Sequence, residues 1–112
     1  MIIEAGSTRV LTDPWFSGKA FNDSWSLIAA PAAVDYSGID YLWISHEHPD
    51  HFHVPTLRAL PASFKQRVTV LFQKSSDHHK MVAALYRVGF RNVLLLPHRK
   101  WVRLKDAEVL CY

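Results

Sequence analysis

The chain has 112 residues and a mass of 12.9 kDa, which is enough for one modest domain and too little for two. Apolar residues make up 49% of it and charged residues 21%, a balance that excludes disordered, collagen-like and low-complexity proteins. The single cysteine excludes an internal disulfide, and no signal peptide or membrane-length apolar run is recognisable. We therefore expect residues 1–112 to form one domain of a reduced, cytoplasmic protein without a membrane span.

The net charge of +3 hides a strong asymmetry between the two halves of the chain. Residues 1–56 contain two basic residues (Lys or Arg) and seven acidic ones (Asp or Glu). Residues 57–112 contain eleven basic residues and three acidic ones. A basic half could attract an anionic or phosphate-bearing small molecule, or a nucleic acid. Because the basic residues are spread out and are not interleaved with aromatic ones, we favour a solvated surface and disfavour nucleic-acid binding.

The amino-terminal third is expected to begin with two short strands and to continue as a loop. A Gly-Ser turn signal at residues 6–7, between apolar pairs, predicts a hairpin over residues 1–12 that ends at Asp13. Residues 15–37 mix Pro, Gly, Asn and Ser with bulky side chains, which predicts a long irregular loop. Loops of this length are more often functional than idle.

The rest of the chain is expected to alternate between strands and helices. The expected elements are a strand over residues 39–44, a helix over 55–60, a strand over 68–72, a helix over 77–88 and strands over 93–96, 101–104 and 109–112. The second helix has the clearest signals, with Asp77 as an N-cap and Gly89 at the C-cap. This order predicts an α/β or α+β sheet with helices on at least one face.

A histidine-rich motif follows the strand expected over residues 39–44. It contains the pattern His-x-His-x-Asp-His, which would arise by chance in about one chain in 600 of this composition. Side chains at positions i and i+2 of an extended segment point the same way, so His46 and His48 can bind one divalent ion. Asp50 and His51 can face a second ion. Imidazole and carboxylate ligands favour zinc, with iron or manganese as alternatives.

This motif predicts a metal-dependent hydrolase, because a metal ion lowers the pKa of bound water to about 7 and supplies hydroxide at neutral pH. Two ions need more ligands than the motif provides, since catalytic zinc generally keeps three protein ligands and a water. A histidine-rich turn that binds no metal is the alternative interpretation. The further ligands would come from missing sequence or from elsewhere in the chain. The candidates within the chain, for which a surface position is the favoured interpretation, are His53, His78, His79 and His98.

The pattern at His46, His48, Asp50 and His51 resembles the signature of the metallo-β-lactamase superfamily. Residues 10–21, which read Val-Leu-Thr-Asp-Pro-Trp-Phe-Ser-Gly-Lys-Ala-Phe, resemble the opening of one branch of it. That branch includes ascorbate phosphate lactonases, N-acyl phosphatidylethanolamine phospholipase D enzymes and the amino-terminal region of CMP-N-acetylneuraminate hydroxylases. Further similarities downstream are strongest to the last of these.

The resemblance implies an α/β (α+β) fold that forms the amino-terminal half of an αβ/βα sandwich. It also implies which residues bind metal, namely His46 and His48 on one ion and Asp50 and His51 on the other. Asp50 would in addition be a catalytic residue. Asp13 would be a buried carboxylate beside the metals and not a ligand, although capping the turn before Pro14 explains it equally well. Since family members carry further ligands downstream, we expect residues 1–112 to be a truncated domain.

Three functions follow from these observations. The first is a metal-dependent hydrolase that attacks an ester, lactone or phosphodiester with metal-activated hydroxide. The second is the metallo-β-lactamase-like domain of a CMP-N-acetylneuraminate hydroxylase-like oxidoreductase, with a separate iron–sulfur module because one cysteine cannot hold a cluster. The third is an inactive fragment or binding module. A small-molecule substrate is the expected partner, and the sequence predicts no oligomeric state.

Overall fold

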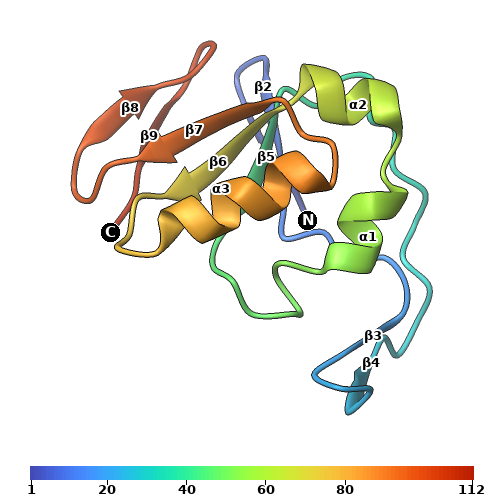
Figure 1. The fold of residues 1–112 in the computed structure, drawn as a ribbon. Coiled ribbons are helices and arrows are strands. Elements are labelled where there is room, and N and C mark those ends of the chain that lie inside the picture. Colours follow the sequence, from blue (N-terminus) through green and yellow to red (C-terminus); the bar gives the residue numbers. More distant parts are fainter.

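The computed structural model describes residues 1–112 and is built around a five-stranded sheet with three helices on one face (Figure 1). The strands are β1 Ile2–Ala5, β2 Thr8–Thr12, β3 Lys19–Ala20, β4 Trp25–Ser26, β5 Tyr41–Ile44, β6 Thr69–Gln73, β7 Asn92–Leu96, β8 Trp101–Arg103 and β9 Glu108–Leu110. The helices are α1 Val54–Ala59, α2 Ala62–Arg67 and α3 His78–Arg87. The fold is thus mixed α/β, as predicted.

The main sheet has the strand order β1-β2-β5-β6-β7. β1 is antiparallel to β2, and the other neighbouring strands are parallel. Two separate hairpins, β3–β4 and β8–β9, lie outside this sheet. Parallel strands are usually covered on both faces, which explains the nearly continuous apolar runs that predicted β5, β6 and β7.

Side chains of the central strands alternate between two apolar clusters. Leu42 and Ile44 of β5 belong to the main core beneath the helices, whereas Trp43 packs against the smaller cluster on the opposite face. Residues of β8 and β9 also pack against that smaller cluster, for example Val109. The period of two along a strand therefore explains why both faces of the sheet are covered.

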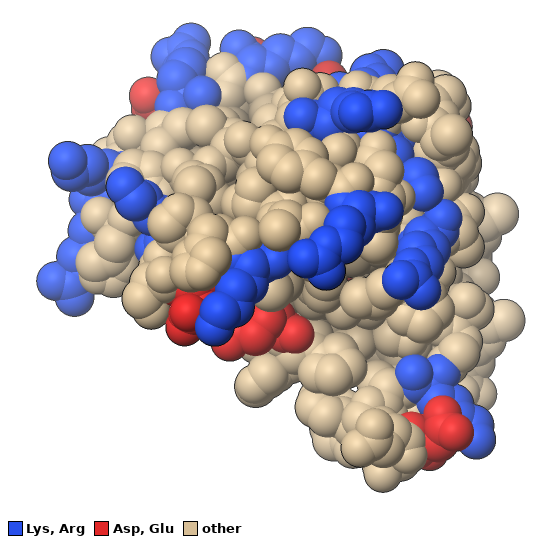
Figure 2. Space-filling model, in the orientation of Figure 1, with Lys and Arg blue, Asp and Glu red and all other residues tan.

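The helices cover one face of the sheet through a few buried side chains. Leu57 of α1, Phe64 of α2 and Leu85 of α3 belong to the main core. Figure 2 shows Lys and Arg side chains distributed over this helical face, where Arg58 and Arg87 are exposed. Even the longest helix, α3, has only ten residues, and none of the helices has the length and hydropathy to cross a membrane.

Three local features differ from the sequence prediction. Helix α2 was not predicted, because its six residues bury only Phe64 and show no helical periodicity. Pro61 forces an extended backbone on Leu60, which ends α1, and then starts α2. The loop expected over residues 15–37 contains the β3–β4 hairpin, whose strands are too short for a detectable alternation.

The third difference concerns the start of α3. Gly89 has the positive φ (104°) expected at the C-cap, but the Asp77 side chain makes no capping hydrogen bond. The backbone of Asp77 lies outside the extended region that an N-cap requires, with φ −102° and ψ 8°. Its carboxylate instead pairs with the Lys80 ammonium group at 3.1 Å.

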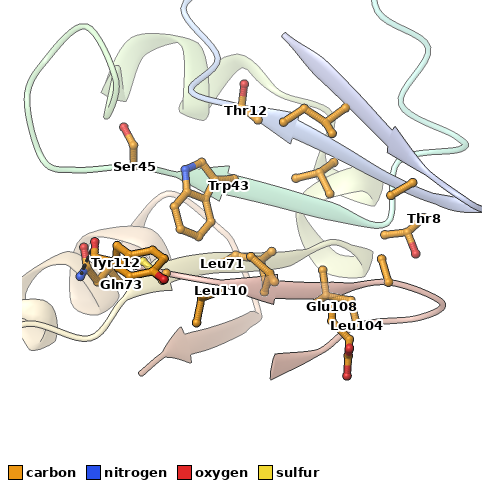
Figure 3. Close-up of a pocket in the computed structure, with 16 residues that line it drawn as sticks. Thr8, Thr12, Trp43, Ser45, Leu71, Gln73, Leu104, Glu108, Leu110 and Tyr112 are labelled. Carbon is orange, nitrogen blue, oxygen red and sulfur yellow. Dashed lines mark hydrogen bonds between the residues drawn. The ribbon is translucent and has the colours of Figure 1, made fainter. Parts of the chain in front are cut away.

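A cavity of about 600 Å³ lies between the main sheet and the β8–β9 hairpin (Figure 3). Most of its lining is apolar and includes Trp43, Leu71 and Leu110. Of the histidine-rich segment over residues 45–51, only Ser45 reaches it. The cavity is therefore distinct from the site that the motif predicts.

The turn between β8 and β9 is fastened to the turn between β1 and β2 by Asp106. Its carboxylate accepts hydrogen bonds from the Thr8 hydroxyl and, at 2.7 Å, from the Ser7 backbone N–H. These hydrogen bonds hold the pKa of Asp106 well below its usual range, and the bond from the Thr8 hydroxyl has the largest effect. Gly6 is required here, because a Cβ at this position would lie 2.9 Å from the Asp106 carboxylate.

The depressed pKa of Asp106 predicts an acid-dependent contribution to stability. Because the unfolded-state pKa is about 3.9, the contribution is complete above that pH and is lost as the pH falls through the folded-state value. We expect Asp106→Asn to lower the urea midpoint at pH 7, with a difference from the wild type that shrinks below about pH 4. Asp77→Asn is the control, since its exposed pair with Lys80 contributes little. Equal losses in both variants, or a loss that does not vary with pH, would contradict this prediction.

Candidate functional site

The site is formed where two neighbouring parallel strands end. Thr12 of β2 is in register with Trp43 of β5, and the Asp13 N–H donates to the Trp43 carbonyl at 2.9 Å. Asp13 and Ser45 therefore follow adjacent strands at the same edge of the sheet. In sheets of this kind, the carboxyl ends of the strands are the usual location of ligand sites.

Asp13 connects β2 to the histidine-rich loop. One carboxylate oxygen, Oδ1, accepts a hydrogen bond from the Ser45 backbone N–H at 2.8 Å. The other, Oδ2, lies 3.0 Å from Nδ1 of His51. Asp13 adopts a left-handed φ of 38°, which aspartate tolerates better than most residues. Both oxygens are thus directed across to the β5 loop.

Two histidine rings contact the Ser45 hydroxyl, and a third, that of His48, contacts one of them. The Ser45 Oγ is 2.9 Å from His46 Nδ1 and 3.1 Å from His51 Nδ1. His46 Nε2 lies 3.0 Å from His48 Nδ1, and the ring centroids of His46 and His51 are 4.1 Å apart. Ser45 was not predicted to belong to the site. Its position directly before the motif, at the end of a strand, was the available signal, because metal-binding histidines need a partner on the second ring nitrogen.

Asp50 has one carboxylate oxygen without a partner. Its Oδ2 lies 3.3 Å from His51 Nε2, whereas Oδ1 is buried and accepts no hydrogen bond. A buried carboxylate oxygen without a partner is rare in proteins and marks a place where an ion or water is expected. The orphaned oxygen lies next to the histidine cluster, where a cation would satisfy it.

The four motif side chains contact one another directly. No group of three or more His, Cys, Asp or Glu side chains is arranged around a common point that could hold a metal ion. Two nitrogen ligands of one tetrahedral zinc are about 3.3 Å apart. His46 Nε2 and His48 Nδ1 are separated by 3.0 Å, so a small rotation of the rings brings them to that spacing.

The donor set also fits a divalent metal chemically. Because Asp13 and Ser45 occupy Nδ1 of His51, Nε2 of that ring is the nitrogen left for a ligand bond. Imidazole nitrogens together with the Asp50 carboxylate are a combination that zinc binds well, and the second nearby carboxylate, Asp13, faces Nδ1 of His51. The residues present therefore fit a divalent metal in composition and proximity.

The four histidines outside the motif do not join this cluster. His78, at the start of α3, contacts the Ser75 carbonyl, and His79 and His98 are exposed. His53 was expected at the surface, but its side chain is only 2% exposed, and that expectation is wrong. The physical reason is that both of its ring nitrogens have partners inside the protein.

His53 fastens the β3–β4 hairpin to helix α1. As the N-cap of α1, its Nδ1 contacts the Thr56 hydroxyl at 2.9 Å, and its Nε2 lies 3.1 Å from the Lys19 carbonyl. A carbonyl only accepts, so Nε2 carries the proton. The Thr56 hydroxyl also accepts from the Phe16 N–H at 3.0 Å. Two buried side chains of α1 thus hold residues 16–19 next to the site.

The family model described as "Beta-lactamase superfamily domain" matches residues 1–109. The chain belongs to the β-lactamase superfamily. Most members of this superfamily are enzymes, and they typically bind metal ions. Membership confirms the resemblance identified from the motif at residues 46–51. No solved structure matches the chain significantly.

Several curated relatives of the chain are cytidine monophosphate-N-acetylneuraminic acid hydroxylases. The Danio rerio protein is 31% identical over 95% of the chain, a match that covers 18% of the relative. The Sus scrofa protein is 39% identical over 54% of the chain and 14% of the relative. The Asterias rubens protein is 41% identical over 52% of the chain and 9% of the relative. The chain therefore spans less than a fifth of the length of these relatives.

The buried His53 predicts a specific loss of stability. We expect His53→Ala to lower the free energy of unfolding by about 1–3 kcal/mol, because Thr56 and the Lys19 carbonyl would lose their partner. Urea denaturation followed by circular dichroism measures this change. The control is His98→Ala, an exposed position where the change should stay within about 0.5 kcal/mol. Similar losses for the two variants would contradict the anchoring role of His53.

Proposed function

We propose that this chain is the metallo-β-lactamase-like domain of a cytidine monophosphate-N-acetylneuraminic acid hydroxylase-like oxidoreductase, and that it binds divalent metal ions. The observation that carries the proposal is the gathering of His46, His48, Asp50 and His51 at the ends of β2 and β5. Similarity to the Danio rerio hydroxylase over 95% of the chain supports the assignment.

In this proposal each residue of the site has a defined task. His46 and His48 bind one ion, and Asp50 and His51 bind the second, with zinc favoured over iron or manganese. A divalent metal supplies a Lewis acid when it is bound. Asp13 holds the His51 ring in position, and the unpaired oxygen of Asp50 is the group directed toward the reacting centre.

The oxidation itself is assigned to another part of such a protein. The chain contains one cysteine, whereas iron–sulfur clusters are held by four Cys ligands or by two Cys and two His. We therefore confine this chain to binding metal and substrate. The substrate of the named relatives, a sugar joined to a nucleotide, agrees with the anionic small molecule expected from the sequence.

A second candidate function is a metal-dependent hydrolase acting on an ester, lactone or phosphodiester. The absence of thiolate from the donor cluster, which consists of imidazoles and one carboxylate, favours this chemistry. Assays of the zinc-loaded chain with bis(4-nitrophenyl) phosphate and 4-nitrophenyl acetate separate the two candidates. Release of nitrophenolate that His46→Ala abolishes would favour the hydrolase.

The motif predicts selective loss of metal binding on mutation. In calorimetric titrations with zinc chloride, we expect the wild type to bind zinc and His46→Ala/His48→Ala to bind at least about tenfold more weakly, because both ligands of one ion are lost. The matched control is His78→Ala/His79→Ala, which removes two neighbouring histidines outside the cluster. Equal losses in the two double variants, or no binding by the wild type, would overturn the proposal.

Replacing Asp13 should have a smaller effect on zinc affinity than replacing both His46 and His48. Asp13→Asn keeps the shape of the side chain but weakens its contact with His51, so we expect zinc affinity to fall by about 10–100-fold. The matched control is Asp23→Asn, since Asp23 lies in the β3–β4 turn and contacts none of the four ligands. An unchanged affinity in Asp13→Asn, with the fold intact by circular dichroism, would remove the orienting role.

A further inference from the structure

The β3–β4 hairpin projects from the body of the molecule beside the histidine-rich loop (Figure 1). Between the hairpin, this loop and the start of α1 lies a pocket of about 570 Å³. The hairpin contributes Lys19, Asn22 and Asp23 to its lining, and the loop contributes Glu47 and Pro49, which flank His48 in the sequence. The pocket is thus next to the proposed metal site, and no role has been assigned to it above.

An exposed aromatic side chain of the pocket lining, Phe21, packs against a second exposed one, Trp25, which lies outside the lining. Phe21, which lines the pocket, is 36% exposed, and Trp25 is 57% exposed. Their ring centroids are 5.3 Å apart, and the Phe21 ring meets the His48 ring edge-on at 6.4 Å. Paired aromatic rings that stay exposed to water are typical of ligand-binding surfaces. This pair lies directly beside one of the proposed metal ligands.

The turn that carries Phe21 has an unusual backbone. Phe21, Asn22 and Asp23 have φ values of 52°, 52° and 66°, in the left-handed region that residues other than glycine rarely adopt. The Ser24 N–H bonds to the Phe21 carbonyl at 3.1 Å, and His53 holds the preceding Lys19. Consecutive strained residues cluster at functional sites. Here the strained turn brings all three of its side chains to the pocket lining.

The polar lining selects the chemistry of the ligand. The carboxylates of Asp23 and Glu47 and the amide of Asn22 offer an excess of hydrogen-bond acceptors. Lys19 is the only Lys or Arg in the lining. A bound phosphate would therefore face the two carboxylates of Asp23 and Glu47 and only one ammonium group, which disfavours its binding. A ring with several hydroxyl donors and at most one carboxylate fits this lining, and its apolar C–H face fits the aromatic rings.

We propose that this pocket binds a sugar ring rich in hydroxyl groups. Phe21 and Trp25 pack against the C–H face of the sugar, and Asn22, Asp23 and Glu47 accept hydrogen bonds from its hydroxyls. This inference deepens the proposed function and rests on it, because it assigns the sugar part of a sugar nucleotide to this chain. The ring is then held beside His48, within reach of the proposed metal site.

The test is binding of the methyl glycoside of N-acetylneuraminic acid to the zinc-treated chain, followed by saturation-transfer NMR and calorimetry. We expect Trp25→Ala to weaken binding by about three- to tenfold. Asp23→Asn should also weaken it, which gives a second test if Trp25→Ala affects folding. The matched control is Trp101→Ala, because Trp101 is 66% exposed on the separate β8–β9 hairpin. Zinc affinity should be the same in all three variants.

The outcomes separate this inference from the proposed function. Sugar binding that depends on Trp25 but not on Trp101 supports the pocket, whatever the zinc titration gives. No sugar binding by a chain that does bind zinc overturns the pocket and leaves the metal site intact. Binding of cytidine monophosphate through Trp25 without binding of the sugar also overturns it, because the aromatic pair would then hold a base. An equal loss in Trp25→Ala and Trp101→Ala overturns it as well.

Discussion

The site depends on the parallel pairing of β2 with β5. This pairing sets Asp13 beside the first residue of the histidine-rich loop, so that one carboxylate can bond the Ser45 N–H and the His51 ring together. Without that register, Asp13 would not reach Ser45 and His51, and the loop would lose its connection to β2. A rigid strand end with a neighbouring carboxylate is what a metal site needs, because ligand rings must be oriented before the ion arrives.

A second group of contacts positions the surroundings of the site. His53 and Thr56, both buried at the start of α1, hold the chain over residues 16–19 and with it the β3–β4 hairpin. The helix is in turn seated on the sheet by Leu57. The proposed sugar pocket is therefore lined by a buried side chain, His53, that holds its surroundings in place, and by the strained turn over residues 21–23.

Much of the fold could be predicted from periodicity and turn chemistry. The apolar runs of β5, β6 and β7 and the stripe of α3 exceed the length at which a period becomes visible. Helix α2 and the β3–β4 hairpin are too short for that, and α2 became evident only through the backbone that Pro61 imposes. Asp77 is the N-cap residue of α3, as predicted, but its side chain makes no capping hydrogen bond, because residue type alone does not fix the φ and ψ of a cap.

The residues of the candidate site were predictable in part. The motif was predictable because its four ligand-type residues, His46, His48, Asp50 and His51, lie within six consecutive residues. Ser45 and His53 act through contacts that only the folded chain shows, because a hydroxyl or a lone histidine has no distinctive spacing. The same holds for Phe21 and Trp25, whose neighbours in space come from the histidine-rich loop and from the other strand of the hairpin.

The most direct test of the central claim is the X-ray absorption spectrum of the zinc-loaded chain. The account predicts a shell of nitrogen and oxygen ligands at about 2.0–2.1 Å with the outer-shell scattering of imidazole. That scattering should weaken when His46 and His48 are both replaced by alanine, because only the His51 imidazole then remains as a ligand. A sulfur ligand at about 2.3 Å, which only Cys111 or a methionine could supply, would contradict the account, as would an unchanged spectrum in the double variant.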